Sequence, residues 1–174
     1  MFRFLLLSAC LFAGPAFAHV TANPDKGEAG KYFETGFRVS HGCGGSDTVS
    51  VSIKMPKGMV TVKPQFKPGW TVSVKKSKLA EPVPAGHGKM TDEQIDEIVW
   101  SGNKLPHGQY DTFGLLMRLP EKAGEILWFP ITQICEKGRL EWVEIPAAAQ
   151  QWHDLKSPAP FVKLEGAAPS AHHH

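Results

Sequence analysis

Val49-Ser50-Val51-Ser52-Ile53-Lys54-Met55 alternates apolar and polar residues along its whole length. A period of two is typical of a β-strand that buries one face and exposes the other. Pro56-Lys57-Gly58 follows directly, and proline and glycine favour turns, so the strand is expected to end there. The segment therefore predicts a half-buried strand, and similar segments recur along the chain.

Four further segments have the same alternation or a largely apolar strand-like run: residues 70–75, 113–119, 126–135 and 140–145. Pro130 argues for an edge position or a bulge in the third of them. Residues 91–97 and 147–152 favour a helix, although the first could equally lead into a strand. Many short strands separated by 17 glycines and 14 prolines predict an all-β fold, an antiparallel β-sandwich that is immunoglobulin-like or similar, with few or no helices.

Composition limits the class of protein. The chain has 174 residues, of which 42% are hydrophobic and 21% charged, enough apolar material for about one globular domain. This composition excludes an intrinsically disordered protein. The formal net charge is only +2 and no long basic block occurs, so nucleic acid is not an expected partner.

The first eighteen residues have the pattern of a signal peptide. Arg3 precedes an apolar run, and Ala16-Phe17-Ala18 is a small-x-small cleavage signal. Cleavage after Ala18 would produce a mature chain that begins at His19 and lies in the periplasm or is secreted. The alternative is lipidation at Cys10, because Leu7-Ser8-Ala9-Cys10 resembles a lipoprotein signal.

The remaining chain divides into a domain over residues 19–156 and a flexible tail rich in proline and alanine over residues 157–174. No apolar span follows the domain, so we expect no membrane anchor in the mature chain. The tail ends in a tract, His172-His173-His174, which could collect metal ions or be the remnant of a purification tag.

Two cysteines remain after cleavage, Cys43 and Cys135. An even number in an exported chain is most simply explained by a disulfide bond. The alternative is a pair of thiolates that binds a metal, and an oxidising compartment argues against it.

A mature chain that begins at His19 offers two nitrogen ligands from one residue, the α-amine and the ring Nδ1. Their unperturbed pKa values are about 7.7–8.0 and about 6.5, so both release a proton readily near neutral pH. Nitrogen ligands in a tetragonal arrangement suit Cu(II). The alternative is that cleavage simply exposes a histidine without a role.

Several motifs, in this order, resemble those of the YcnI-like family of copper-binding domains. They are His19-Val20-Thr21-Ala22-Asn23-Pro24 with Gly30, Arg38-Val39-Ser40-His41-Gly42-Cys43, Pro68-Gly69-Trp70, Glu97-Ile98-Val99-Trp100-Ser101-Gly102, Leu105-Pro106-His107-Gly108-Gln109-Tyr110-Asp111-Thr112-Phe113, Gln133-Ile134-Cys135 and Trp142-Val143-Glu144. The resemblance covers residues 19–146. It implies an exported β-sandwich that binds one Cu(II) per chain through a single-histidine brace.

The resemblance also implies particular site residues. His19 would bind copper through its amine and imidazole, Asp111 would supply the carboxylate, and Trp142 would lie close by. An aspartate stands where the family typically has a glutamate, and the membrane segment that follows the domain in some relatives is missing. Asp111 has the strand parity of Phe113, although a turn position is the alternative. The alternative carboxylates are those of Glu141 and Glu144, and Trp142 could also be an ordinary core residue.

The sequence thus predicts a Cu(II)-binding protein of copper trafficking or homeostasis, not an enzyme, which exchanges copper with another periplasmic copper-handling protein. A first alternative is a copper oxygenase with a histidine brace, which needs a second histidine such as His41, His107 or His153. A cupredoxin needs a free cysteine thiolate, which a disulfide would remove. A metal-free sandwich that binds another protein is the last alternative.

Overall fold

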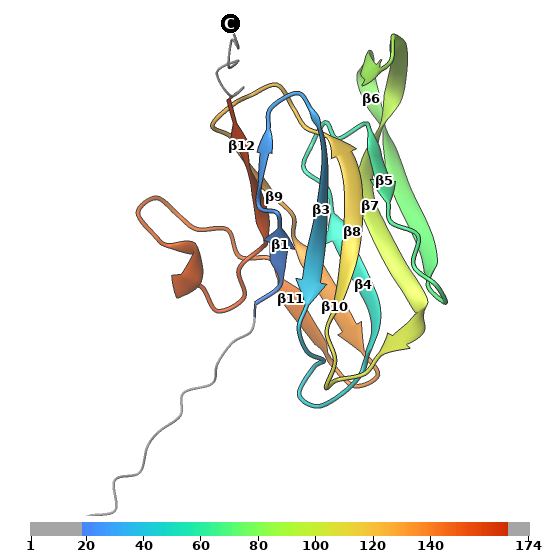
Figure 1. Ribbon diagram of the computed structural model, residues 1–174, viewed down its shortest axis with the longest axis vertical. Coiled ribbons are helices and arrows are strands. Elements are labelled where there is room, and N and C mark those ends of the chain that lie inside the picture. Colours follow the sequence, from blue (N-terminus) through green and yellow to red (C-terminus); the bar gives the residue numbers. More distant parts are fainter. Residues whose placement is uncertain (1–18, 167–174) are drawn as a thin grey trace, which may run out of the picture.

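Strands make up almost all of the regular structure in residues 19–166, the part of the chain that this computed structural model describes (Figure 1). The elements are β1 (Thr21–Asn23), β2 (Lys26–Glu28), β3 (Tyr32–Val39), β4 (Thr48–Lys54), β5 (Val62–Pro64), β6 (Thr71–Gly86), β7 (Lys89–Leu105), β8 (Asp111–Arg118), β9 (Ile126–Trp128), β10 (Ile131–Cys135), β11 (Arg139–Trp142), the 3-10 helix η1 (Trp152–Asp154) and β12 (Phe161–Glu165).

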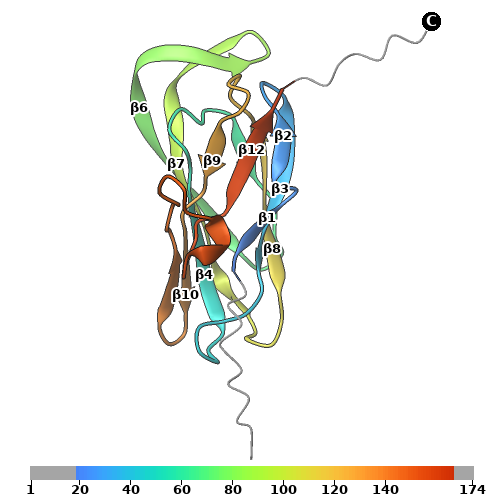
Figure 2. The ribbon, with the colours of Figure 1, turned by 90° about the vertical axis from the view of Figure 1, so that its left-hand side faces the viewer.

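These strands form two larger sheets and a small one. The strand order is β1-β3-β8-β5 in the first sheet, β11-β10-β4-β7-β6 in the second and β2-β12-β9 in the third. Figure 2, turned by a quarter, shows the first and second sheets on opposite sides of the molecule. Among the described strands, all ladders are antiparallel except that between β12 and β2. The predicted all-β sandwich is confirmed.

The alternation of residues on β8 explains how the two layers meet. Phe113, Leu115 and Met117 are fully buried, whereas Leu116 between them is 41% exposed. The ring of Phe113 lies 5.6 Å from that of Trp100 on β7, centroid to centroid, so the first sheet packs on the second. Burying each of these side chains stabilises the fold by about 1.5–3 kcal/mol relative to leaving it exposed to water.

The predicted strand over residues 126–135 is interrupted at its proline. β9 and β10 belong to different sheets, and residues 129–130 connect them. The Phe129 N–H donates to the carbonyl of Pro160, while the Pro130 carbonyl accepts from Lys54, on the neighbouring sheet. Because proline has no N–H to give to a ladder, the chain changes sheets at this point.

Neither predicted helical segment forms an α-helix. Residues 91–97 lie within the long strand β7, because pairing with β6 overrides their local helical preference. Residues 147–150 form a turn in which the Gln150 N–H donates to the Ala147 carbonyl, and the 3-10 helix η1 begins only at Trp152. The strand expected over residues 140–145 is β11, which ends earlier, at Trp142. It is not the last strand, because β12 follows it at Phe161–Glu165.

The expectation of a loose tail from residue 157 does not hold up to residue 165. Val162 and Leu164 of β12 are fully buried, and the strand pairs with both β2 and β9. The signal peptide over residues 1–18, the alternative lipidation at Cys10 and the tract His172-His173-His174 lie outside the described residues. Within residues 19–166, no helix has the length and apolar character needed to cross a bilayer.

Candidate metal centre

His19 lies two residues before β1 and is partly buried. Its neighbour Val20 is 1% exposed and belongs to the core, and Thr21 pairs with Arg38 on β3. The backbone that follows His19 is therefore held by the packing of Val20 and by the ladder at Thr21. His19 has a defined place at one edge of the first sheet.

Two tryptophans contact His19. The ring of Trp142, at the end of β11, lies 6.1 Å from the imidazole with an interplanar angle of 65°. The ring of Trp152, on η1, lies 5.2 Å away at 88°. Both contacts are edge-to-face, a favoured arrangement of aromatic rings. The structure therefore brings His19 and Trp142 together, and it adds Trp152, which the sequence analysis did not select.

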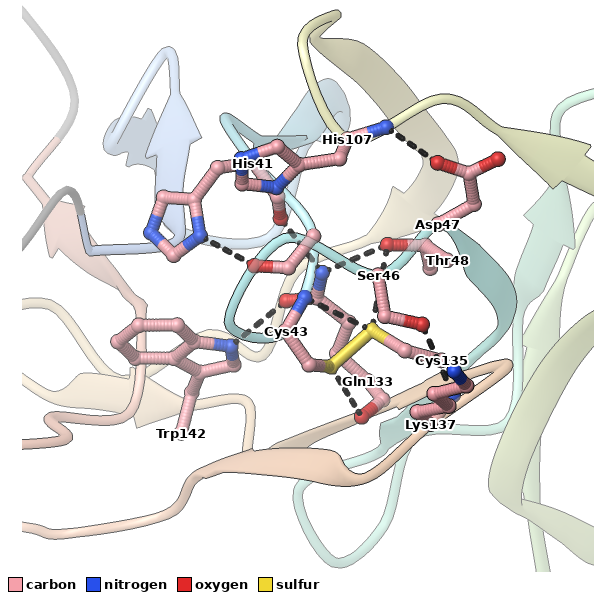
Figure 3. The surroundings of a disulfide bond; sticks show 11 residues. His41, Cys43, Ser46, Asp47, Thr48, His107, Gln133, Cys135, Lys137 and Trp142 are labelled. Atoms are coloured by element: carbon pink, nitrogen blue, oxygen red, sulfur yellow. Dashed lines mark hydrogen bonds between the residues drawn. A yellow bond between two sulfur atoms is a disulfide. The ribbon is translucent and has the colours of Figure 1, made fainter.

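Trp142 is a core residue as well, since it is 3% exposed, and its indole is held by a buried glutamine (Figure 3). The Nε1–H of Trp142 donates to Oε1 of Gln133 at 3.2 Å. The Gln133 Nε2 donates to the His41 carbonyl and to Oγ1 of Thr48, both at 2.7 Å. Gln133 is fully buried, and both polar atoms of its side-chain amide are hydrogen-bonded. It therefore fixes the indole relative to the loop between β3 and β4.

His41 is in that loop and contacts the same indole. Its ring lies 6.3 Å from the ring of Trp142, and its Nδ1 is 2.7 Å from the carbonyl oxygen of Gly42 (Figure 3). His41 and His19 are therefore both neighbours of Trp142. His107, in contrast, donates its backbone N–H to the Asp47 side chain. His87 lies in the turn between β6 and β7, the far hairpin, where its ring stacks on that of Tyr32.

Below this loop the predicted disulfide bond is present. Cys43 and Cys135 are bonded, with their Cα atoms 5.9 Å apart, and both residues are buried. The bond ties the loop to the end of β10, beside Gln133. Disulfides persist in oxidising compartments, so the bond indicates an extracytoplasmic protein.

The structure places Asp111 at the start of β8, with its carboxylate in an ion pair. Its Oδ1 lies 2.7 Å from Nζ of Lys67, and that side chain is only 13% exposed. Lys67 also donates to the Thr112 carbonyl and lies over the ring of Phe113. β3 separates β8 from β1, so the backbones of these two strands are about 10 Å apart at the usual strand spacing. No contact of the structure brings Asp111 to His19.

The alternative carboxylates also have partners. Glu141 pairs with Arg139 at 3.1 Å, along the exposed strand β11. Glu144 accepts a hydrogen bond from the backbone N–H of Ser157 at 2.7 Å. Each carboxylate is thus already used by the fold.

A cleft of about 440 Å³ lies directly beside His19, and it is lined by His19, His153, Asp154, Leu155 and Lys156. Four of these residues come from η1 and the loop after it. More than a hundred residues separate them from His19, so no local spacing in the sequence could have revealed the cleft.

The donor set beside His19 suits a borderline cation, because imidazole nitrogen and carboxylate oxygen are both at hand. Within residues 19–166, no three His, Cys, Asp or Glu side chains are already gathered as a metal-binding cluster. Any site here therefore needs more than side chains in their present positions.

The comparisons with known proteins agree with this architecture. A protein from Nocardia farcinica with an immunoglobulin-like fold superposes with a TM-score of 0.63 at 23% identity, covering 84% of this chain and 98% of that one. The copper-binding protein CutI of Bacillus subtilis is 26% identical over 137 residues, which are 78% of this chain. The matched region spans only 60% of the length of CutI.

The family model for the domain of unknown function DUF1775 matches residues 19–164, from the candidate metal ligand to the last strand. That range includes every element of the sandwich and both tryptophans that contact His19. The chain therefore belongs to the DUF1775 family, in agreement with the YcnI-like resemblance of its motifs.

Proposed function

We propose that this protein binds one Cu(II) ion outside the cytoplasm, in the periplasm or as a secreted protein, and serves copper trafficking or homeostasis. His19 is the principal ligand: cleavage after Ala18 frees its α-amine, which closes a six-membered chelate with Nδ1. The single observation that carries the proposal is the position of His19 at the edge of the sandwich, packed between Trp142 and Trp152. Copper binding by the relative CutI, as its name states, supports the choice of metal.

The two tryptophans have a clear part in this proposal. Both indoles contact the imidazole and restrict its rotation, so less ring freedom is lost when the metal binds. Their apolar faces also keep water from part of the site, which strengthens the interactions of the bound ion. Gln133 supports the arrangement indirectly by holding Trp142.

Asp111 is the proposed carboxylate ligand on the strength of the family resemblance. Its Oδ1 already pairs with Lys67. The ammonium of Lys67 therefore opposes the binding of a second cation to the same carboxylate. Lys67→Met should then raise the copper affinity if Asp111 is a ligand and leave it unchanged if Asp111 is not.

The deciding experiment is a Cu(II) titration of two matched proteins. The first begins at His19, and the second begins one residue earlier, at Ala18. All forms carry alanine at positions 172–174, so that the terminal histidines do not bind the metal. We expect one equivalent of Cu(II) on the first form and a loss of about 100-fold or more in affinity on the second. Removing a group that merely orients a metal ligand already lowers metal affinity about 10–100-fold, and here a ligand itself is removed.

The controls separate binding from folding. Circular dichroism and thermal unfolding of the two forms should coincide, because one added residue leaves the core unchanged. Asp111→Ala is titrated in parallel. Equal affinity of the two forms would overturn the chelate, and a mature form that takes up no Cu(II) would overturn the proposed function as a whole.

A further inference from the structure

The cleft beside His19 is built by a loop that has a fixed conformation. The segment between β11 and β12 projects from the side of the sandwich, with η1 near the start of β1 (Figures 1 and 2). Its two ends are joined, since the N–H groups of Val143 and Glu144 both donate to the Ser157 carbonyl and Ala159 donates back to Glu144. The cleft wall is therefore a closed loop.

Trp152 anchors η1 to the body of the protein. Its Nε1–H donates to the Ala159 carbonyl at 2.7 Å, and its ring lies 6.0 Å from that of Phe161 on β12. The same ring also contacts His19, with the two ring centroids 5.2 Å apart. Since His153 and Asp154 follow Trp152 directly, this anchor holds them next to the N-terminal histidine.

His153 and Asp154 form an exposed contact in which a carboxylate faces one ring nitrogen. The Nε2 of His153 lies 3.6 Å from Oδ1 of Asp154, an ion-pair distance rather than a hydrogen bond, and the two side chains are 75% and 57% exposed. The other carboxylate oxygen accepts from the Gln151 N–H at 3.3 Å. Metal-binding histidines commonly direct one ring nitrogen to a carboxylate and bind the metal with the other. Within the described residues, Nδ1 of His153 makes no hydrogen bond, so it is free for a metal.

We propose that His153 is a further copper ligand, which binds through Nδ1, and that Asp154 is its positioning residue. This inference rests on the proposed function and deepens it, because the copper would then have three nitrogen ligands: the α-amine and imidazole of His19 and the imidazole of His153. The two imidazoles lie on the same cleft and come from opposite ends of the domain. Copper would join the start of the chain to the β11–β12 loop.

The test is electron paramagnetic resonance of the Cu(II)-loaded mature chain, again with alanine at positions 172–174. The nitrogen splitting should report three nitrogens in the parent and two in His153→Ala. The affinity should fall about 10-fold or more in His153→Ala. Asp154→Asn should keep three nitrogens but bind about 10-fold more weakly, because it loses only the orienting charge. His87→Ala is the matched control, an exposed histidine on the far hairpin.

The outcomes distinguish the two proposals. If His153→Ala and the parent have the same nitrogen count and affinity, the inference is overturned while the His19 chelate stands. If the parent itself takes up no copper, the proposed function is overturned instead. Circular dichroism checks that His153→Ala is folded, and His153→Gln repeats the measurement with a side chain of similar size.

Discussion

Replacing Gln133 with leucine should destabilise the protein strongly, although the two side chains are close in size. Gln133 is fully buried and its amide makes three hydrogen bonds, to Trp142, to Thr48 and to the His41 carbonyl. Leucine can replace none of them. The indole N–H and the threonine hydroxyl would then be buried without their amide partner.

The magnitude follows from these lost partners. A buried polar group left without a hydrogen bond costs about 1–3 kcal/mol. With two such groups buried, we expect a loss of about 2–6 kcal/mol in the free energy of unfolding. For a domain of this size each kcal/mol lowers Tm by about 3 °C, so Tm should fall by about 6–18 °C.

Urea denaturation followed by tryptophan fluorescence measures this loss, and differential scanning calorimetry measures the change in Tm. Gln109→Leu is the matched control, since this glutamine is exposed and its side chain makes no hydrogen bond within the described residues. The control should change stability by less than about 0.5 kcal/mol. A loss below about 1 kcal/mol for Gln133→Leu would refute the reasoning that this amide network holds Trp142 in place.

Three further changes test other parts of the structure. Removing the disulfide with Cys43→Ala and Cys135→Ala should cost up to about 4–5 kcal/mol in urea unfolding, because the bond closes a loop of 92 residues; an unchanged midpoint would contradict this. The hydrogen bond and charge of Lys75 hold the pKa of Glu97 below its usual range, so the stabilisation by this carboxylate is present above about pH 4 and disappears as the pH falls further. Glu97→Gln should therefore cost about 1 kcal/mol at pH 7 and almost nothing near pH 2, and a constant cost across this range would argue against the ion pair. Gly42→Ala should cost about 1–3 kcal/mol by thermal unfolding, because a Cβ at this position would collide with backbone atoms of its own turn; a wild-type Tm would contradict this.

Much of the fold could be predicted because its signals are local. The alternation in residues 49–55 and 113–119 matches β4 and β8, since a strand with one buried face must alternate. The disulfide was predictable because only two cysteines follow the proposed cleavage site. The failures were also local in origin: residues 91–97 favour a helix by themselves, and pairing with β6 overrides that preference.

The candidate site was predictable only in part. Its first ligand could be proposed from the cleavage pattern, and Trp142 from the family motif, and the structure places these two in contact. Trp152 carries no pattern in the sequence that marks it, and His153 was only one of three histidines considered for an oxygenase brace. The ion pair of Asp111 with Lys67 was equally invisible, because it depends on how the segment after β5 lies against β8.

The sequence by itself therefore determined several of the strands, the covalent link and the histidine that the proposed cleavage would expose, since each depends on neighbouring residues or on simple counting. Only the tertiary structure decided which side chains surround that histidine. The order of strands in the sheets brings the first described residue to a loop near residue 152, and a contact across so many residues depends on packing of the whole domain rather than on any local pattern.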